Sequence, residues 1–198
     1  KTNFCDSIHR NDTVSLSQEL ENLEAKMDSQ TGVYVLEDGS GSMVARAWLS
    51  EYAEKTIDIQ YFIFSMDNVG LIACDYLIRA ADRGVKIRIL TNSLASTDNV
   101  EAFSSYQTDR EKLLKTGVRI FEFRPDAAER TKIMTGELQE KLDHKPTFGL
   151  HAKSMVIDKQ TTVIGTFNLD PRSANLNTEC IVVVNSSKVS KGVLKGME

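Results

Sequence analysis

Short runs of β-branched and aromatic residues alternate with amphipathic stretches through residues 33–123, and this alternation most constrains the fold. Residues 56–64 predict a buried strand, because β-branched and aromatic side chains pack well on a pleated surface. Residues 68–83 carry apolar side chains at helical spacing, and Gly84 is a natural helix end. Helices that alternate with strands predict an α/β fold, with an α/β/α sandwich built around a mixed sheet.

The same signals predict the remaining elements. Further strands are expected at residues 33–36, 85–90, 118–123, 153–158, 162–165 and 179–184. Further helices are expected at residues 42–52, with Ser42 as the N-cap, and at residues 100–115, before Gly117. Another helix opens within residues 187–198.

The spacing of apolar residues also predicts which helix faces are buried. The helix at residues 42–52 is expected to bury a stripe of four residues, namely Val44, Ala47, Trp48 and Tyr52. The helix at residues 68–83 is expected to bury a face that includes Leu71 and Ile72.

Length and composition fit one globular domain. The chain has 198 residues, of which 41% are hydrophobic and 26% charged, and this excludes wholly disordered and low-complexity classes. We expect residues 1–31 to form a polar N-terminal arm and residues 32–198 to form a single domain, with a polar excursion at 124–148. Lys1 is not followed by the basic and then apolar segment typical of a signal peptide, so a processed chain is expected. No apolar run is long enough for a transmembrane helix.

Charge and cysteine content argue against several functions. Lys and Arg number 24 against 28 Asp and Glu, which gives a net charge of −4. A protein that binds nucleic acid through its phosphates is expected to be basic instead. Cys5, Cys74 and Cys180 are scattered without a CxxC pair, which argues against a disulfide framework or a zinc site.

One segment carries residues suited to chemistry, and its spacing predicts that they meet. His151 opens a predicted strand and Lys153 lies two residues further on, so both side chains project from the same face. Asn168 follows the next predicted strand, which we expect to pair with the first. The imidazole, the ammonium group and the amide are therefore predicted to converge at one end of the sheet.

Such a group suits an anionic substrate. The Lys153 ammonium and the Asn168 amide can hold two oxygens of a phosphoryl group and stabilise the charge that develops there. His151 can attack phosphorus or move a proton. A carboxylate on the other ring nitrogen would set the tautomer, and Glu179, at the start of the last predicted strand, is the candidate. The arrangement requires no metal or other cofactor.

A structural interpretation of the same residues is the alternative. A lone histidine is more often structural or solvated than catalytic, Lys153 fits an edge strand, and Asp158 fits a turn. The combination of these residues at fixed offsets is much rarer than any one of them, and it favours a functional site.

These residues carry a family resemblance. The pattern HxKxxxxD at residues 151–158, followed by GxxN at 165–168, resembles the signature of the phospholipase D superfamily. The wider stretch GLHAKSMVID…VIGTFNLDPRSANLNTE resembles the bacterial cardiolipin synthase and phospholipase D-like branch. Two earlier stretches, GSGSMVARAWLSEYAEKTIDIQYFIF and AADRGVKIRIL, resemble the start of the same proteins, so the resemblance covers about residues 32–185.

The resemblance implies a catalytic domain at residues 32–198, with an α/β/α sandwich and a phosphohistidine intermediate formed at His151. It implies that Lys153 and Asn168 bind the phosphate and that Asp158 supports the motif structurally. Ser173 would support the substrate-binding site, and Glu179 would orient an imidazole.

The chain departs from this branch in carrying the motif once, whereas the branch normally carries it twice in one chain. His144 lacks the motif spacing and His9 lies in the polar arm, so neither supplies a second motif. The expectation is a homodimer that completes the active site; the alternative is an incomplete or inactive piece.

Three functions remain open at this point. The first is phospholipid hydrolysis or phosphatidyl transfer, with peripheral membrane contact and a bacterial cell envelope location. The second is a single-motif dimeric nuclease. The charge pattern argues against it, because acidic residues interrupt the basic residues near the motif: Glu137, Glu140 and Asp143 lie among Arg130, Lys132, Lys141 and Lys145. The third is a non-catalytic half-domain.

Overall fold

The computed structural model describes residues 30–62, 67–97, 100–127 and 149–198. Residues Val33–Glu198 form one compact unit. Nearly all of the predicted arm at 1–31, with Cys5 and His9, lies outside the described residues. Phe64 also lies outside the described residues, as does most of the predicted excursion at 124–148, which contains His144 and the interleaved acidic and basic residues.

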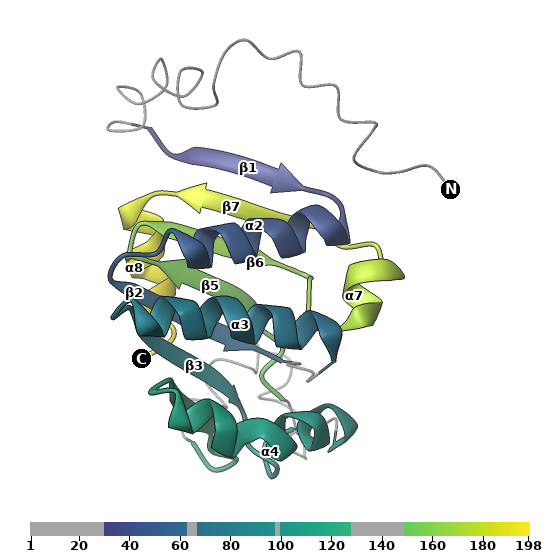
Figure 1. The fold of residues 1–198 in the computed structure, drawn as a ribbon. Helices are drawn as coiled ribbons and strands as arrows, with labels where there is room; N and C mark the ends of the chain where they lie inside the picture. The colour runs from purple at the N-terminus through teal and green to yellow at the C-terminus, as the bar shows by residue number, and fades with distance from the viewer. Residues whose placement is uncertain (1–29, 63–66, 98–99, 128–148) are drawn as a thin grey trace, which may run out of the picture. The chain divides into compact units, whose positions relative to one another are not determined.

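The described strands form one mixed sheet of seven, in the order β1-β7-β6-β5-β2-β3-β4 (Figure 1). The strands β2, β3 and β4 run parallel, whereas β5 pairs antiparallel with both β2 and β6, and β6 with β7. The strands are β1 (Gly32–Leu36), β2 (Thr56–Tyr61), β3 (Lys86–Asn92), β4 (Arg119–Phe123), β5 (Lys153–Ile157), β6 (Thr161–Gly165) and β7 (Ile181–Asn185).

Helices cover both faces of this sheet, so the predicted α/β/α sandwich is confirmed. The helices are α2 (Gly39–Glu51), α3 (Asn68–Asp82), α4 (Val100–Lys115), α7 (Pro171–Asn175) and α8 (Ser187–Lys195). In Figure 1, α2 and α3 lie side by side over one face, where Met155 of β5 meets them. A 2.7 Å hydrogen bond between Thr162 and Ser190 attaches α8 to the opposite face.

The N-terminus and the buried face of α2 differ from the sequence prediction. Asp38, not Ser42, is the N-cap, and its carboxylate accepts a hydrogen bond from the Gly41 N–H. Three of the four residues of the predicted stripe face solvent instead, since Val44, Trp48 and Tyr52 are between 54% and 66% exposed, whereas Ala47 is half-buried. The buried face of α2 carries Ser42, Arg46 and Ser50.

Close helix packing explains which face of α2 is buried. A Cβ atom at Gly39 would lie 2.6 Å from the Ser173 carbonyl oxygen of α7, so only glycine permits this approach. Gly39 lies on the same helical face as Ser42 and Arg46, and this contact turns Trp48 outward. In α3 the buried residues are Gly70, Cys74, Leu77 and Ala80. The predicted burial of Cys74 and Leu77 is thus confirmed, whereas Leu71 and Ile72 are about half exposed and were wrongly placed on the buried face.

Several boundaries near the site also shift. β2 ends at Tyr61 rather than at residue 64, and β3 continues to Asn92, inside a stretch expected to be a loop. β7 begins at Ile181, so Glu179 precedes the strand that it was expected to open. The short helix α7 was not predicted from the sequence. Among the described residues, no helix combines the length and the apolar character needed to cross a bilayer.

Replacement of Gly165 is expected to destabilise the sheet. A Cβ atom there would lie 2.7 Å from the Ile181 Cα atom and would also clash with the Cys180 carbonyl group, so β6 and β7 would have to separate. We predict that Gly165→Ala lowers the free energy of unfolding in urea by at least about 2 kcal/mol. The matched control is Gly192→Ala in α8, where a Cβ atom meets nothing within 4 Å. In that variant the free energy of unfolding should rise by up to about 1 kcal/mol. Equal effects of the two substitutions on the free energy of unfolding would contradict the prediction.

Candidate active site

The predicted contact between the histidine and the lysine is present at the start of β5. Lys153 is the first residue of β5 and is only 6% exposed, whereas His151, just before the strand, is exposed to solvent. The Lys153 Nζ atom lies 3.1 Å from His151 Nε2 and 3.1 Å from the His151 carbonyl oxygen. The ammonium group can thus donate to the Nε2 lone pair, which places the imidazole proton on Nδ1.

Phe62 completes one wall of this group and was not identified from the sequence. It directly follows β2, where Tyr61 pairs with Lys153 across the antiparallel ladder. Its ring centroid lies 4.6 Å from that of His151 and 5.0 Å from Lys153 Nζ, so it packs on the imidazole and makes a cation–π contact. The sequence analysis interpreted residues 56–64 as a core strand. Only the pairing of the strands shows that Phe62 reaches His151.

Burial changes the ionisation of Lys153. Loss of solvation lowers its pKa to about 8, although the carboxylates of Glu179 and Asp170 oppose the shift. The side chain is therefore a cation at neutral pH that becomes neutral under mildly alkaline conditions.

Glu179 lies in a hydrogen-bonded network beside Lys153. It is 4% exposed and accepts hydrogen bonds from the Thr166 hydroxyl group and, at 3.2 Å, from the Asn177 amide. Burial alone would raise the pKa of Glu179, but hydrogen bonds from Thr166, Ser173 and Asn177, with the Lys153 charge, outweigh it and leave the pKa below its ordinary value. Glu179 is thus held as an anion, and its predicted role in orienting an imidazole stays a prediction.

Ser173 fixes the backbone at Asn168. The Asn168 N–H donates to Ser173 Oγ at 3.1 Å, and Ser173 is fully buried. The Ser173 N–H donates in turn to Asp170, the N-cap of α7. The Asn168 Oδ1 atom is buried and has no hydrogen-bond partner within the described ranges. The short helix α7 therefore holds Asn168 in place, while phosphate binding by its amide stays a prediction.

Asn92 positions the segment that leads into His151, and the sequence analysis missed it. Its Nδ2 atom donates to the Leu150 carbonyl oxygen at 3.0 Å, and its Oδ1 atom accepts from the Leu150 N–H at 2.7 Å. The buried amide thus pairs with the backbone as a neighbouring strand would. An asparagine two residues beyond the predicted strand at 85–90 was the only available signal, and it is a weak one.

Asp158 is the one predicted site residue that the structure does not bring to the others. It follows the far end of β5. The rise per residue of an extended strand places it about 20 Å from His151. Its carboxylate accepts hydrogen bonds of 2.7–2.9 Å from the backbone N–H groups of Glu54, Lys55 and Thr56. Asp158 therefore joins the β5–β6 turn to the start of β2, in keeping with the structural support implied by the family resemblance.

The site is thus an exposed imidazole, a buried ammonium group and a buried carboxylate, gathered with Asn168 at one end of the sheet. In the part of the chain that the structure describes, no group of three His, Cys, Asp or Glu residues has the geometry to hold a metal ion.

Comparison with known proteins agrees with this fold. Residues 50–198 match the family described as "Cardiolipin synthase, PLD-like domain". Cardiolipin synthase C of Escherichia coli is 40% identical over 116 residues, which cover 58% of this chain and 24% of that protein. Cardiolipin synthase of Oceanobacillus iheyensis is 27% identical over 172 residues, which cover 87% of this chain and 32% of that protein. The chain thus spans between a quarter and a third of the length of these relatives.

Solved structures share the fold at low sequence identity. Nuc of Salmonella typhimurium, a phospholipase D family member, superimposes with a TM-score of 0.61 at 17% identity, covering 84% of this chain and 91% of that one. Phosphatidylserine synthase of Haemophilus influenzae gives 0.59 at 12% identity, covering 89% of this chain and 40% of that one. The chain belongs to the phospholipase D superfamily, in its cardiolipin synthase branch.

The Asp158 contacts predict a pH-dependent loss of stability. Burial alone would raise the pKa of Asp158, but the three backbone hydrogen bonds outweigh it and leave the pKa below its ordinary value. Since the folded-state pKa is the lower one, the stabilisation is present above the unfolded-state value of about 4 and is lost as pH falls through the folded-state value.

We therefore predict that Asp158→Ala lowers the free energy of unfolding by about 2 kcal/mol at neutral pH, measured in urea, and by much less near pH 3. The matched control is Asp75→Ala, which removes an exposed carboxylate that pairs only with Arg79 of the same helix, and it should change little. A deficit of Asp158→Ala that persists in full at acid pH would contradict this account.

Proposed function

We propose that this domain acts on phospholipids as a phosphodiesterase or phosphatidyltransferase of the phospholipase D or cardiolipin synthase type, through a phosphohistidine at His151. The observation that carries the proposal is the 3.1 Å contact between Lys153 Nζ and His151 Nε2, in a chain 40% identical to cardiolipin synthase C over 116 residues. A buried cation beside an exposed imidazole suits a phosphodiester, whose negative oxygens need a positive partner.

The contact also suggests how the nucleophile is released. In the free site the Nε2 lone pair accepts the Lys153 hydrogen bond, so the imidazole is held but not reactive. A substrate phosphate offers better acceptors, and the ammonium group and the Asn168 amide can turn to its non-bridging oxygens. Nε2 then attacks phosphorus, an N–P bond forms, and the P–O bond to the leaving alkoxide breaks.

The reaction needs a second acid and base. The leaving alkoxide must receive a proton, and the water or lipid hydroxyl group that later breaks the N–P bond must lose one. A second copy of the chain is the proposed source of a second imidazole for these proton transfers, which makes the active form a symmetric homodimer. If the protein sediments as a strict monomer and is fully active, the homodimer is contradicted. That result would leave the proposed role of His151 unchanged.

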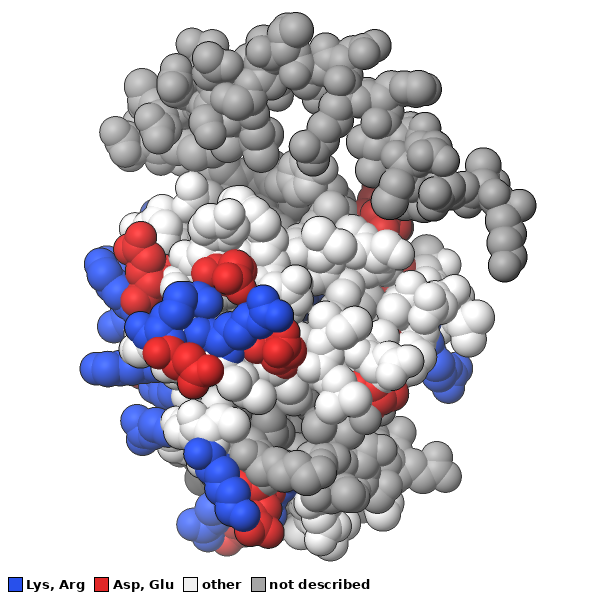
Figure 2. Space-filling model, in the orientation of Figure 1, with Lys and Arg blue, Asp and Glu red and all other residues white. Residues whose placement is uncertain are grey.

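A single-motif nuclease is the second candidate. Nuc and NucT of Helicobacter pylori each superimpose over 84% of this chain and 91% of their own, so their size fits this domain. Their identities of 17% and 13% support the fold alone, however, and the net charge of −4 argues against a polyanionic substrate. Figure 2 shows acidic and basic side chains interspersed on the described face, with no continuous basic surface there. A lipid substrate would also require contact with a bilayer surface.

The first test is replacement of His151. We predict that His151→Ala lowers turnover by more than ~1000-fold, as expected when a nucleophile is lost. The assay presents phosphatidylglycerol vesicles, single-stranded DNA and duplex DNA side by side, and release of glycerol, phosphatidic acid or cardiolipin supports the lipid function. The matched control is His144→Ala, which lies outside the motif and should retain activity. Cut DNA with untouched vesicles would favour the nuclease, and full activity of His151→Ala would remove the proposed mechanism.

The second test uses the ionisation of Lys153. Because its pKa is about 8, the ammonium group is lost as pH rises through that value, and kcat/KM should fall with it. Lys153→Arg keeps the charge at all accessible pH values, so its residual activity should lack this alkaline limb. An unchanged limb in Lys153→Arg would show that another group titrates.

A further inference from the structure

Phe62 contacts both members of the pair formed by His151 and Lys153. Its ring centroid lies 4.6 Å from that of His151, with 54° between the ring planes, and 5.0 Å from Lys153 Nζ. A tilted aromatic pair at this separation is attractive, and a ring face stabilises an ammonium group that is shielded from water. One half-buried side chain from the end of another strand thus acts on the imidazole and on the cation together.

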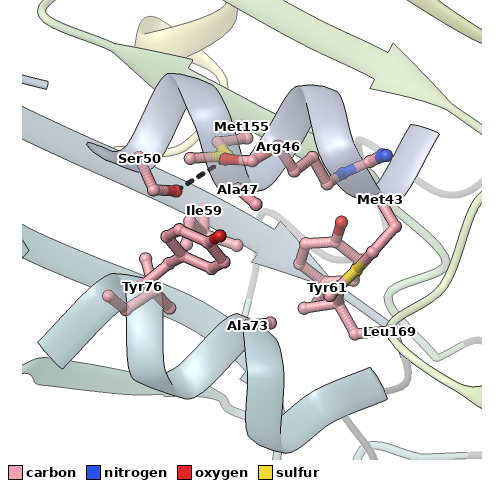
Figure 3. A pocket seen from close by; sticks show the side chains of 11 residues that line it. Met43, Arg46, Ala47, Ser50, Ile59, Tyr61, Ala73, Tyr76, Met155 and Leu169 are labelled. Atoms are coloured by element: carbon pink, nitrogen blue, oxygen red, sulfur yellow. Dashed lines mark hydrogen bonds between the residues drawn. The ribbon is translucent and has the colours of Figure 1, made fainter. Parts of the chain in front are cut away.

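Burial of the preceding residue fixes the backbone at Phe62. Tyr61 is the last residue of β2 and is 1% exposed. Figure 3 shows its ring beneath α2, where Met43 and Leu169 line the same small cavity. The guanidinium carbon of Arg46 lies 5.9 Å from the centroid of this ring. Phe62 therefore continues from a strand end that close packing holds in place.

The ring contact between Phe62 and His151 does not depend on the hydrogen bond from Lys153. In the proposed reaction the ammonium group leaves His151 Nε2 and turns to a phosphate oxygen. The imidazole then loses this constraint at the moment when Nε2 must point at phosphorus. The packing of Phe62 on the imidazole remains through this change, and the orientation of a nucleophile strongly affects its rate of attack.

We propose that Phe62 is a positioning residue, which keeps the His151 ring in its attacking orientation and stabilises Lys153 as a cation. The first role rests on the proposed function, because it concerns a reacting imidazole. The second role concerns the ionisation of Lys153 in the free protein, and it can be measured without any catalysis.

The ionisable groups around Lys153 are distinct from the Phe62 ring. In the described part of the chain they come from its own segment, α7, the segment before β7, β2 and α2, and they are His151, Asp170, Glu179, Tyr61 and Arg46. Burial lowers the pKa of Lys153 to about 8, and the two carboxylates oppose the shift. Leucine in place of Phe62 would leave all these groups present and would keep an apolar neighbour. A lower pKa of Lys153 in that variant would therefore report the loss of the ring face.

The first test is a titration of the Lys153 side chain. NMR of protein labelled with 13C-lysine follows its Cε signal, which Lys153→Arg assigns. We expect the pKa of Lys153 to fall by about one pH unit in Phe62→Leu, because the cation loses the ring face. Phe62→Tyr keeps the ring face and should restore the wild-type pKa. The matched control is Phe121→Leu on β4, which removes a ring 5.2 Å from the Arg119 guanidinium carbon and should leave the pKa of Lys153 unchanged.

The second test measures the orientation of the imidazole through kinetics. At about pH 6, where Lys153 stays charged, Phe62→Leu should lower kcat about tenfold and change KM by less than about twofold. The proposed mechanism assigns phosphate binding to Lys153 and Asn168, so a misplaced nucleophile slows the attack more than it weakens binding. The alkaline limb of kcat/KM should move to lower pH together with the Lys153 titration. Phe62→Tyr should restore kcat, and Phe121→Leu should keep it.

A second variant covers the case in which Phe62→Leu does not fold. Phe62→Met also keeps an apolar side chain and removes the ring, so it should behave in the same way in both measurements. An unchanged pKa of Lys153 in these variants, or a kcat equal to that of the wild type, would overturn the proposal. Wild-type protein without activity on phosphodiesters would contradict the proposed function instead, and the titration would still decide the effect of Phe62 on Lys153.

Discussion

The position of β5 between β2 and β6 is the constraint on which the site depends. β5 pairs antiparallel with both neighbours, so Lys153 at its start lies beside Tyr61 at the end of β2 and close to the end of β6. Each neighbouring strand then leads into a site residue, Phe62 or Asn168. A slip of one residue would turn Lys153 to the opposite face of the sheet, so these candidate site residues meet only in this register.

Two buried cations share the face of the sheet beneath α2, and they are compensated differently. Lys153 has the carboxylates of Glu179 and Asp170 near it, and it can also lose its proton, because burial lowers its pKa to about 8. Arg46 packs against the rings of Tyr61 and Phe167 and has no means of losing its charge. The charge of Lys153 can therefore change with pH, whereas the charge of Arg46 stays fixed.

Much of the site could be predicted from local sequence, and the misses have identifiable causes. The side chains of His151 and Lys153 share a face because alternation along a strand is a local property. Phe62 and Asn92 were missed because they approach the motif from the ends of β2 and β3, and the order of strands in a sheet leaves no trace in sequence spacing. The outward face of α2 was mistaken for its core face, because the apolar stripe through Trp48 is stronger than the polar stripe through Ser42 and Arg46.

The sequence by itself determined the α/β class, nearly all of the element order and the contact between His151 and Lys153. These depend on periodicity, turn residues and spacing, which act within a few residues. Only the tertiary structure decided that the Asp158 carboxylate binds the backbone at the start of β2, that α7 holds Asn168 through Ser173, and that Arg46 lies on the buried face of α2. Those outcomes depend on contacts between residues far apart in the chain, where close approach at Gly39 outweighs the local apolar pattern.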